Sequence, residues 1–275
     1  MIPLDYHIHT TFSPDGSAAP EAMCRRAIEL GLPEIGFSEH WDVGPYEEIT
    51  RFLQPEVWWG ELTRLRELFA GQLTLRAGIE VAEPHLYPAD SAAIIALLPF
   101  DYVLGSVHFV GPHMMFDEKY FRRCTADEVY LPFFAELEQM VRLADMDIVA
   151  HFDVPTRTAI PIFGYDVTRY EQPIRRILDL VIARGLALDV NVAGLRKPAN
   201  NLMPDPLILH WYRQMGGERL TLGSDAHHVE QLGQNMDQAL QAVREAGFTH
   251  LTQYESRRAY PIPLDSLNSL SHSVV

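Results

Sequence analysis

Histidine and acidic residues recur near the ends of short apolar segments along this 275-residue chain. Two of them, His7 and His9, stand two positions apart in the segment Leu4-Asp5-Tyr6-His7-Ile8-His9. Residues i and i+2 of a strand point to the same face, so this pair could hold one metal ion. A lone pair of this kind is more often polar surface, and further ligands are needed to favour a metal site. Seven more candidates follow: Asp15, His40, Glu80, His108, His151, Asp225 and His227.

An alternation of predicted strands and helices positions these residues. The expected strands cover residues 4–9, 34–40, 73–81, 101–108, 147–151, 186–191 and 220–224. The expected helices cover residues 20–30, 55–70, 91–98, 126–144, 170–185, 205–215 and 229–246. Residues 249–254 are a candidate eighth strand, and residues 109–124 form an aromatic and Met-rich loop that could close over a substrate or pack on a partner. Nearly every predicted strand therefore ends at a candidate ligand, and Asn191 stands at the end of the sixth.

Successive candidates are separated by roughly 30 to 40 residues, about one β/α unit each. Such repeats form either a barrel or a doubly wound sheet. A barrel brings the carboxyl ends of all its strands to one mouth, whereas a doubly wound sheet concentrates function at one switch point. No Gly-x-Gly-x-x-Gly follows the first strand. We therefore predict a single α/β domain over residues 1–275, a distorted TIM-like (β/α) barrel with seven strands, and leave residues 265–275 unplaced.

Composition limits the class of protein and its partners. With 47% hydrophobic and 21% charged residues, the chain is typical of a soluble globular protein. A formal net charge of −15 disfavours nucleic acid and anionic membranes as partners. Cys24 and Cys124 form no CxxC motif, and no apolar run is long enough to span a bilayer. We expect a cytoplasmic protein that acts on a small molecule, and its oligomeric state is open.

The candidate ligands outnumber those that one metal ion needs. A zinc site takes three or four protein ligands, so six histidines, one glutamate and two aspartates imply two or three ions. Glu80 is suited to bridge two of them, and ligands without thiolate fit zinc, iron or manganese. Taken singly, each has a plain alternative: a buried or surface histidine, an N-cap at Asp225, a turn residue at Asp15. One such residue per strand end is hard to obtain by chance.

The motifs together resemble the polymerase and histidinol phosphatase (PHP) family. They are His7-x-His9, Asp15, Ser38-Glu39-His40, Gly78-Ile79-Glu80, Gly105-Ser106-Val107-His108, Ala150-His151-Phe152-Asp153 and Gly223-Ser224-Asp225-Ala226-His227. The stretch from Asn191 to Pro198 is similar to the histidinol-phosphate phosphatases of that family. This resemblance implies a distorted (β/α)7 barrel with a trinuclear site. Its pattern implies three ligand sets: His7, His9, Glu80 and Asp225; Glu80, His108 and His151; Asp15, His40 and His227.

The resemblance also implies an activity, the metal-dependent hydrolysis of L-histidinol phosphate to L-histidinol and inorganic phosphate in histidine biosynthesis. A metal-bound hydroxide would attack phosphorus while cations absorb the developing charge. We expect Arg196 and then Arg157 to contact the phosphate, although both could be surface arginines. His40 could bind substrate and donate the proton to the leaving group, unless a metal-bound water does so. The expected catalytic residues are His40, Arg196 and Asp225.

Two further residues and three other functions stay open at this stage. Asp153 could orient a ligand, cap a helix or form a salt bridge, and Glu39 points away from His40 and is interpreted as structural. The nearest alternative function is a family phosphoesterase acting on a nucleotide or other phosphate ester. A metal-holding regulatory protein would be expected to have lost ligands. An amidohydrolase-type barrel would need a lysine at a strand end, and none is found there.

Overall fold

The computed structural model describes residues 2–44 and 50–264. Its strands are β1 (Glu34–Trp41), β2 (Thr74–Ala82), β3 (Tyr102–Ser106), β4 (Phe109–Val110), β5 (His113–Met114), β6 (Ile148–Val149), β7 (Ala187–Asn191), β8 (Leu220–Gly223), β9 (His250–Glu255) and β10 (Arg258–Pro263). Its α-helices are α1 (Pro20–Glu29), α2 (Pro55–Leu68), α3 (Pro88–Leu97), α4 (Glu118–Phe121), α5 (Ala126–Leu143), α6 (Thr156–Phe163), α7 (Glu171–Arg184), α8 (Pro206–Gln214) and α9 (Met236–Glu245). Short 3-10 turns cover Val167–Tyr170, Ala193–Arg196 and Val229–Gln231. The unplaced tail lies outside the described residues.

Proline and capping residues set several of the helix starts. α1, α2, α3 and α8 each begin with a proline in the first turn, where no backbone N–H is needed. α5 begins with a capping box, in which the side chains of Thr125 and Glu128 satisfy each other's backbone N–H groups. α7 ends at Gly185, whose φ of +65° suits a residue without Cβ. Local sequence therefore fixes where these helices begin and end.

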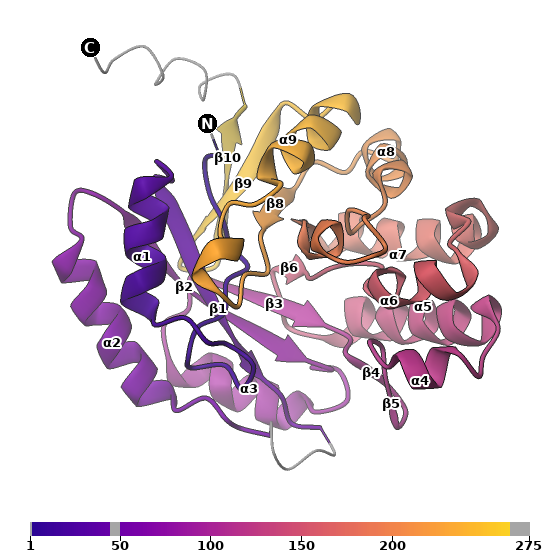
Figure 1. Ribbon diagram of the computed structural model, residues 1–275, viewed down its shortest axis with the longest axis horizontal. Helices are drawn as coiled ribbons and strands as arrows, with labels where there is room; N and C mark the ends of the chain where they lie inside the picture. Colours follow the sequence, from indigo (N-terminus) through magenta and orange to yellow (C-terminus); the bar gives the residue numbers. More distant parts are fainter. Residues whose placement is uncertain (1, 45–49, 265–275) are drawn as a thin grey trace.

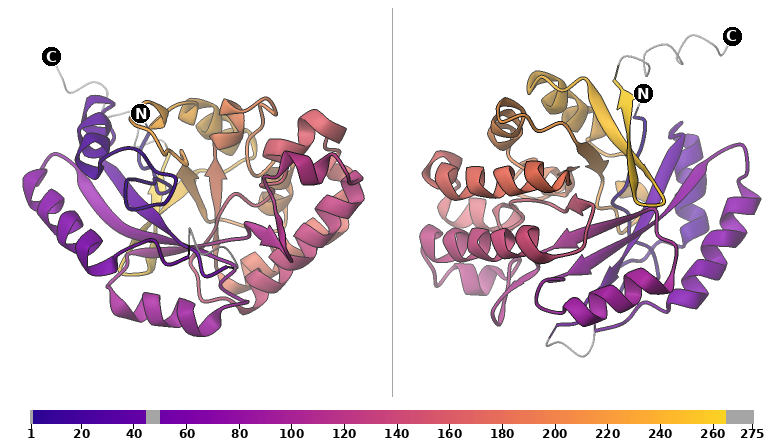
Figure 2. Two further views of the ribbon diagram at one scale, coloured as in Figure 1. Left: turned by 60° about the horizontal axis from the view of Figure 1, so that its bottom comes forward. Right: turned by 180° about the vertical axis from the view of Figure 1, so that it is seen from behind.

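A six-stranded parallel sheet forms the centre of the molecule, in the order β1-β2-β3-β6-β7-β8. The sheet curves, and helices lie on its outer side (Figures 1 and 2). Strand pairing already brings candidate ligands together, because His40 of β1 is paired with Glu80 of β2. No helix within residues 2–44 or 50–264 combines the length and the apolar character needed to cross a membrane.

The N-terminal segment closes this sheet into a barrel. On one side Asp5 bridges to Ile35 of β1, and on the other Ile8 bridges to Ala226 just after β8, both in parallel orientation. The backbone N–H of Tyr6 donates to the carbonyl of Leu222 at 2.9 Å. The predicted strand over residues 4–9 thus takes the form of bridges to both neighbours. This segment is the seventh strand of the barrel, and the six-stranded sheet supplies the other six.

Several elements differ from the sequence predictions. Residues 250–255 form β9, which pairs antiparallel with β10 in a separate sheet, so the prediction of an eighth barrel strand is wrong. The predicted loop 109–124 contains the β4–β5 hairpin and α4, and α6 was not predicted. The last predicted helix is divided, because Gly233 and Asn235 both have positive φ and interrupt it before α9. These differences affect connections and the C-terminal hairpin and leave the barrel order intact.

Tyr102 of β3 packs inside the barrel against the N-terminal segment. Its ring stacks on that of Tyr6 with centroids 4.7 Å apart, and its hydroxyl donates to the carbonyl of Tyr6 at 2.8 Å. Gly36 and Gly78 make room for the ring, because a Cβ at either position would overlap it. This fully buried contact anchors the segment that carries His7 and His9.

We predict that Tyr102→Phe lowers the free energy of unfolding by about 1–2 kcal/mol, because a buried carbonyl loses its donor. Urea denaturation would measure the change. Tyr260→Phe, at a residue that is 43% exposed, is the matched control and should change little. Equal stability of the two variants would contradict an anchoring role for the Tyr102 hydroxyl.

Candidate metal centre

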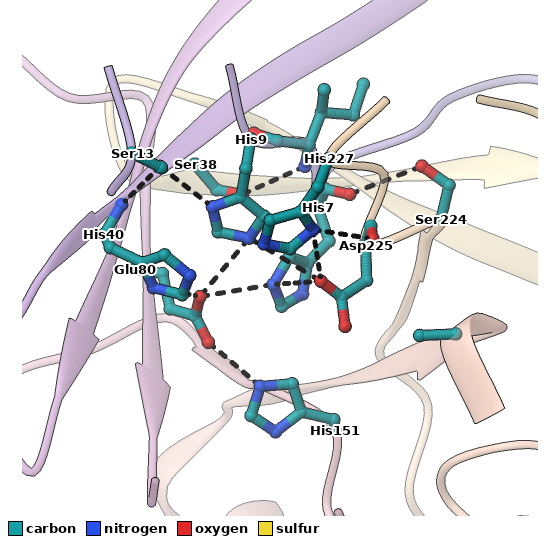
Figure 3. Close-up of polar contacts among 12 residues, drawn as sticks. His7, His9, Ser13, Ser38, His40, Glu80, His151, Ser224, Asp225 and His227 are labelled. Atoms are coloured by element: carbon teal, nitrogen blue, oxygen red, sulfur yellow. Dashed lines mark hydrogen bonds and ion pairs between the residues drawn. The ribbon is translucent and has the colours of Figure 1, made fainter. Parts of the chain in front are cut away.

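All nine predicted ligands lie at one end of the barrel. His40 and Glu80 lie on β1 and β2, and the others lie on the N-terminal segment, in the loop that follows it, or just after β3, β6 and β8. Side chains far apart in sequence point toward one another there (Figure 3). Eight of the nine are buried or nearly so, whereas the Asp15 side chain is 61% exposed. The structure therefore brings the complete predicted set together.

Glu80 lies at the centre of this group and is fully buried (Figure 3). The nitrogens of five histidines surround its two oxygens: His7, His9 and His40 at 3.4, 3.4 and 3.1 Å from Oε2, and His108 and His151 at 3.3 and 3.0 Å from Oε1. The two oxygens thus face two different sets of imidazoles. This is the arrangement expected of a carboxylate that bridges two cations.

The two aspartates extend the group on either side. Asp225 Oδ1 lies 3.8 Å from His9 Nε2 and 4.0 Å from His7 Nε2. Asp15 lies 3.6 Å from His40 Nε2 and 3.1 Å from His227 Nε2. Asp225 thus lies beside His7 and His9, and Asp15 lies beside His40 and His227.

The donor atoms fit divalent ions. Four of them are buried and have no hydrogen-bond partner among the described residues: His7 Nε2, His9 Nε2, His40 Nδ1 and Glu80 Oε2. Buried polar atoms are nearly always satisfied, so four such atoms facing one another fit the donors of a cation-binding site. Four groups of three residues each have their donor atoms within 4.8 Å of one another. They are His9, His40 and His227; His7, His9 and Asp225; His7, Glu80 and His151; and His40, Glu80 and His108.

The electrostatics differ between the candidate ligands. Although burial would lower their pKa values, Glu80 and neighbouring carboxylates raise the pKa of His40 to about 9 and those of His7 and His108 well above the ordinary value. Burial alone would raise the pKa of Glu80, but the surrounding imidazoles of His7, His40 and His108 hold it well below its usual value. Burial and the neighbouring imidazoles of His40 and His227 lower the pKa of His9 well below its ordinary value. An ionised carboxylate and a neutral imidazole are the forms that bind metal ions.

A second layer of side chains orients the imidazoles. His7 Nδ1 donates to Asp189 Oδ2 at 2.9 Å, and both side chains are buried. Ser13 gives its own proton to Glu39, so it accepts from His9 Nδ1 at 3.2 Å. Each contact leaves Nε2 of the imidazole free to face the centre. Neither Asp189 nor Ser13 was predicted as a partner, although Asp189 was detectable because it shares a strand face with Asn191.

A cavity of about 300 Å³ opens onto the centre. Phe109, Met114 and Phe116 from the predicted aromatic loop line it, together with Asp42 and most of the candidate ligands. The β4–β5 hairpin and the residues after it thus border the site. Asp42 was also missed, and its Oδ1 lies 3.5 Å from His108 Nδ1. The volume suits a small molecule.

The two predicted phosphate contacts differ in position. Arg157 lines the cavity, lies 3.7 Å from Asp225 Oδ2 and stacks 4.4 Å above the ring of Phe116. Arg196 does not appear among the cavity-lining residues, and its Nη2 donates to the carbonyls of Ser224 and Asp225 at 2.7 and 3.0 Å. Its Nη1 is buried without a partner in the described part of the chain. Arg196 therefore braces the turn that carries Asp225.

Two residues with predicted supporting roles are also placed. Glu39 accepts hydrogen bonds from Thr10 and Ser13 and holds the loop after the N-terminal segment, in line with its structural interpretation. Asp153 accepts from the backbone N–H of Asp205 at 3.0 Å, next to the start of α8. Of the alternatives for Asp153, this contact favours a role at a helix start.

Residues 5–193 match the model of the PHP domain. The chain belongs to the PHP domain family. The matched segment contains seven of the predicted ligands, and Asp225 and His227 join the site from beyond it. The expected fold is confirmed by a crystal structure from Lactococcus lactis with a TM-score of 0.85 at 23% identity, covering 94% of this chain and 98% of that one. That protein is described as a histidinol phosphate phosphatase complexed with zinc, L-histidinol and phosphate.

Two curated sequences align with this PHP chain over most of their length. A probable histidinol-phosphatase from Deinococcus radiodurans is 27% identical, with 94% of this chain and 98% of that one covered. The histidinol-phosphatase of Lactococcus lactis is 25% identical over 94% and 96% of the two chains. The match therefore extends beyond the PHP domain segment in both relatives.

We predict that Asp189→Asn weakens divalent metal binding about 10-fold, because the amide orients His7 but no longer supplies negative charge to it. Zinc affinity would be measured by competition with a chromogenic chelator. Asp179→Asn, on the exposed side of α7, makes the same chemical change away from the site and should leave the affinity unchanged. Unaltered zinc affinity in Asp189→Asn would rule out this role.

Proposed function

We propose that this chain hydrolyses L-histidinol phosphate to L-histidinol and inorganic phosphate. The observation that carries the proposal is the group of nine candidate oxygen and nitrogen ligands, Glu80 included, which borders a cavity of small-molecule size. Curated relatives named histidinol-phosphatase match nearly the full chain and support the choice of substrate. The proposed reaction would be a step of histidine biosynthesis, as the family resemblance implies.

The ligand distances support three divalent ions. His7, His9 and Asp225 would hold the first, His108 and His151 the second, and Asp15, His40 and His227 the third, with Glu80 shared by the first two. Zinc fits this nitrogen-rich, thiolate-free set, as do iron and manganese. When bound, such ions supply Lewis acidity toward phosphate oxygens and lower the pKa of water. The third set includes the exposed Asp15, so we expect it to be the weakest.

Arg157 is the residue best placed to bind the phosphate group. Its guanidinium is at the cavity wall, held between the ring of Phe116 and the carboxylate of Asp225. A planar guanidinium can contact two phosphate oxygens at once and offset their charge. Arg196 would act behind it by fixing the carbonyls of Ser224 and Asp225.

His40 is assigned to the ion-binding set. Its Nδ1 lies 3.1 Å from Glu80 Oε2 and its Nε2 lies 3.6 Å from Asp15. A nitrogen that binds an ion cannot hold the proton that the leaving alkoxide requires, and the other ring nitrogen of His40 also faces a carboxylate. His40 would therefore position the phosphate through the ion it helps to hold.

Phosphate release from L-histidinol phosphate tests this function directly. Metal-counted protein would be compared on a nucleoside monophosphate, glycerol phosphate and a phosphodiester, each with and without chelation. We expect a kcat/KM for L-histidinol phosphate at least about 100-fold above the others, since its polar groups can pair with a site built for them. Chelation should abolish it. Turnover of nucleotides or the diester alone would retain the metal centre and reject the substrate.

We predict that Arg157→Ala lowers kcat/KM about 100-fold, because a cation facing the reacting phosphate is lost. Arg157→Lys should recover part of it, as an ammonium keeps the charge without the planar fork. Steady-state kinetics would be compared with Arg142→Ala, which removes an arginine from an exposed pair on α5. A small effect at Arg157 with a large one in Arg196→Ala would transfer the phosphate contact to Arg196.

A further inference from the structure

Glu83 is a buried carboxylate beside the metal centre that the proposed mechanism does not use. It follows β2 three residues after Glu80, is 3% exposed and does not line the cavity. Its φ of +43° is unusual for a residue other than glycine. A buried acid in a strained backbone conformation next to a site requires a specific reason.

The carboxylate of Glu83 binds the main chain at the start of the β4–β5 hairpin. Its Oε1 accepts from the backbone N–H of His108 at 2.5 Å and from that of Phe109 at 2.9 Å. The two N–H groups belong to a candidate ligand and to a residue that lines the cavity. One oxygen atom thus holds both the ligand and the cavity wall.

The main chain of Glu83 is itself held on both sides. Its N–H donates to the carbonyl of Ser106 at 2.9 Å, and its own carbonyl accepts from Leu86 at 2.9 Å. A left-handed conformation persists in a residue with a Cβ only where its surroundings impose it. These contacts hold the backbone in the conformation from which the Glu83 carboxylate reaches the turn after β3.

The contacts of His108 show what this arrangement controls. The His108 carbonyl accepts from Met115 at 2.8 Å, so the backbone of His108 is held at its N–H by Glu83 and at its carbonyl by the far end of the hairpin. The imidazole then reaches Glu80 Oε1 at 3.3 Å. A shift of the backbone would displace the imidazole from the centre and move Phe109 in the cavity wall.

We propose that Glu83 is a positioning residue that fixes His108 for metal binding and holds the β4–β5 hairpin against the substrate cavity. This inference rests on the metal-dependent function proposed above. It adds a residue that contacts neither ion nor substrate and acts through two backbone N–H groups. Removing the carboxylate should therefore affect metal binding and KM together.

Four variants separate the carboxylate from the backbone strain. Glu83→Gln keeps an acceptor oxygen at the same reach, Glu83→Asp shortens it, and Glu83→Ala removes it. Glu83→Gly also removes it but adopts positive φ without strain. Glu67→Ala, on the exposed side of α2, is the control. Bound zinc per chain under fixed chelator competition and the separate kcat and KM values would be measured, with melting curves to verify folding.

We expect Glu83→Ala, Glu83→Gly and Glu83→Asp to weaken zinc binding about 10- to 100-fold and to raise KM. Glu83→Gln should stay within about 5-fold of the original chain, because its amide oxygen still accepts both N–H groups. If Glu83→Ala does not fold, Glu83→Asp and Glu83→Gln still decide the question. Unchanged zinc binding and KM in folded Glu83→Asp, or full recovery in Glu83→Gly, would overturn the proposal.

The zinc measurement also separates this proposal from the proposed function. If the original chain binds zinc but does not hydrolyse L-histidinol phosphate, the substrate assignment fails and the Glu83 comparison on zinc still stands. If the original chain hydrolyses the substrate and Glu83→Asp matches it in zinc binding and KM, the function stands and the role of Glu83 fails.

Discussion

The buried charge of Glu80 is the constraint on which the rest of the structure depends. An isolated carboxylate in a protein interior costs several kcal/mol unless other charges compensate it. Five imidazoles supplied by the N-terminal segment and the ends of β1, β3 and β6 surround this one. Their positions require parallel strands whose carboxyl ends meet at one mouth, which is what a barrel provides. The barrel fold is therefore what brings the compensating imidazoles to the buried charge of Glu80.

The barrel alone does not orient the ligand side chains. Neighbouring residues orient them, and some of the ligands have a strained backbone conformation as a result. His151 and Asp225 have positive φ although neither is a glycine. Asp225 is held by Arg196, which binds the carbonyls of Ser224 and Asp225. His7 is held by Asp189 behind it. Strained residues persist only where neighbouring contacts over-determine them, and the Arg196 hydrogen bonds are such contacts for Asp225. The large apolar core elsewhere in the barrel can offset this cost.

The sequence predicted the barrel and the ligand set because both depend on local patterns. An apolar run that ends in His40 or Glu80 predicts both a strand and a metal ligand at the end of that strand. The contacts of Ser13 and Asp42 with the candidate ligands could not be predicted from sequence, because they depend on how loops fold back over the mouth of the barrel. The contacts of Arg196 with the carbonyls of Ser224 and Asp225 were not predicted, since side-chain direction in a short 3-10 turn has no sequence signature. The position of β9 in the fold was predicted wrongly for a similar reason. The sequence shows its strand propensity but does not show that it pairs with β10 outside the barrel.

The order of the ligands along the chain gives the site a further property. His9 and Asp225 are near opposite ends of the described chain, yet their side chains lie 3.8 Å apart because the N-terminal segment bridges to β1 and to the chain after β8. The ligand group is therefore complete only once the barrel has closed. A site with this topology does not exist in a partly folded chain, so ions that bind it stabilise the closed barrel over every open form. Metal binding and barrel closure are thus thermodynamically linked, and the PHP domain segment up to residue 193 needs the strand and turn at residues 220–227 to complete the centre.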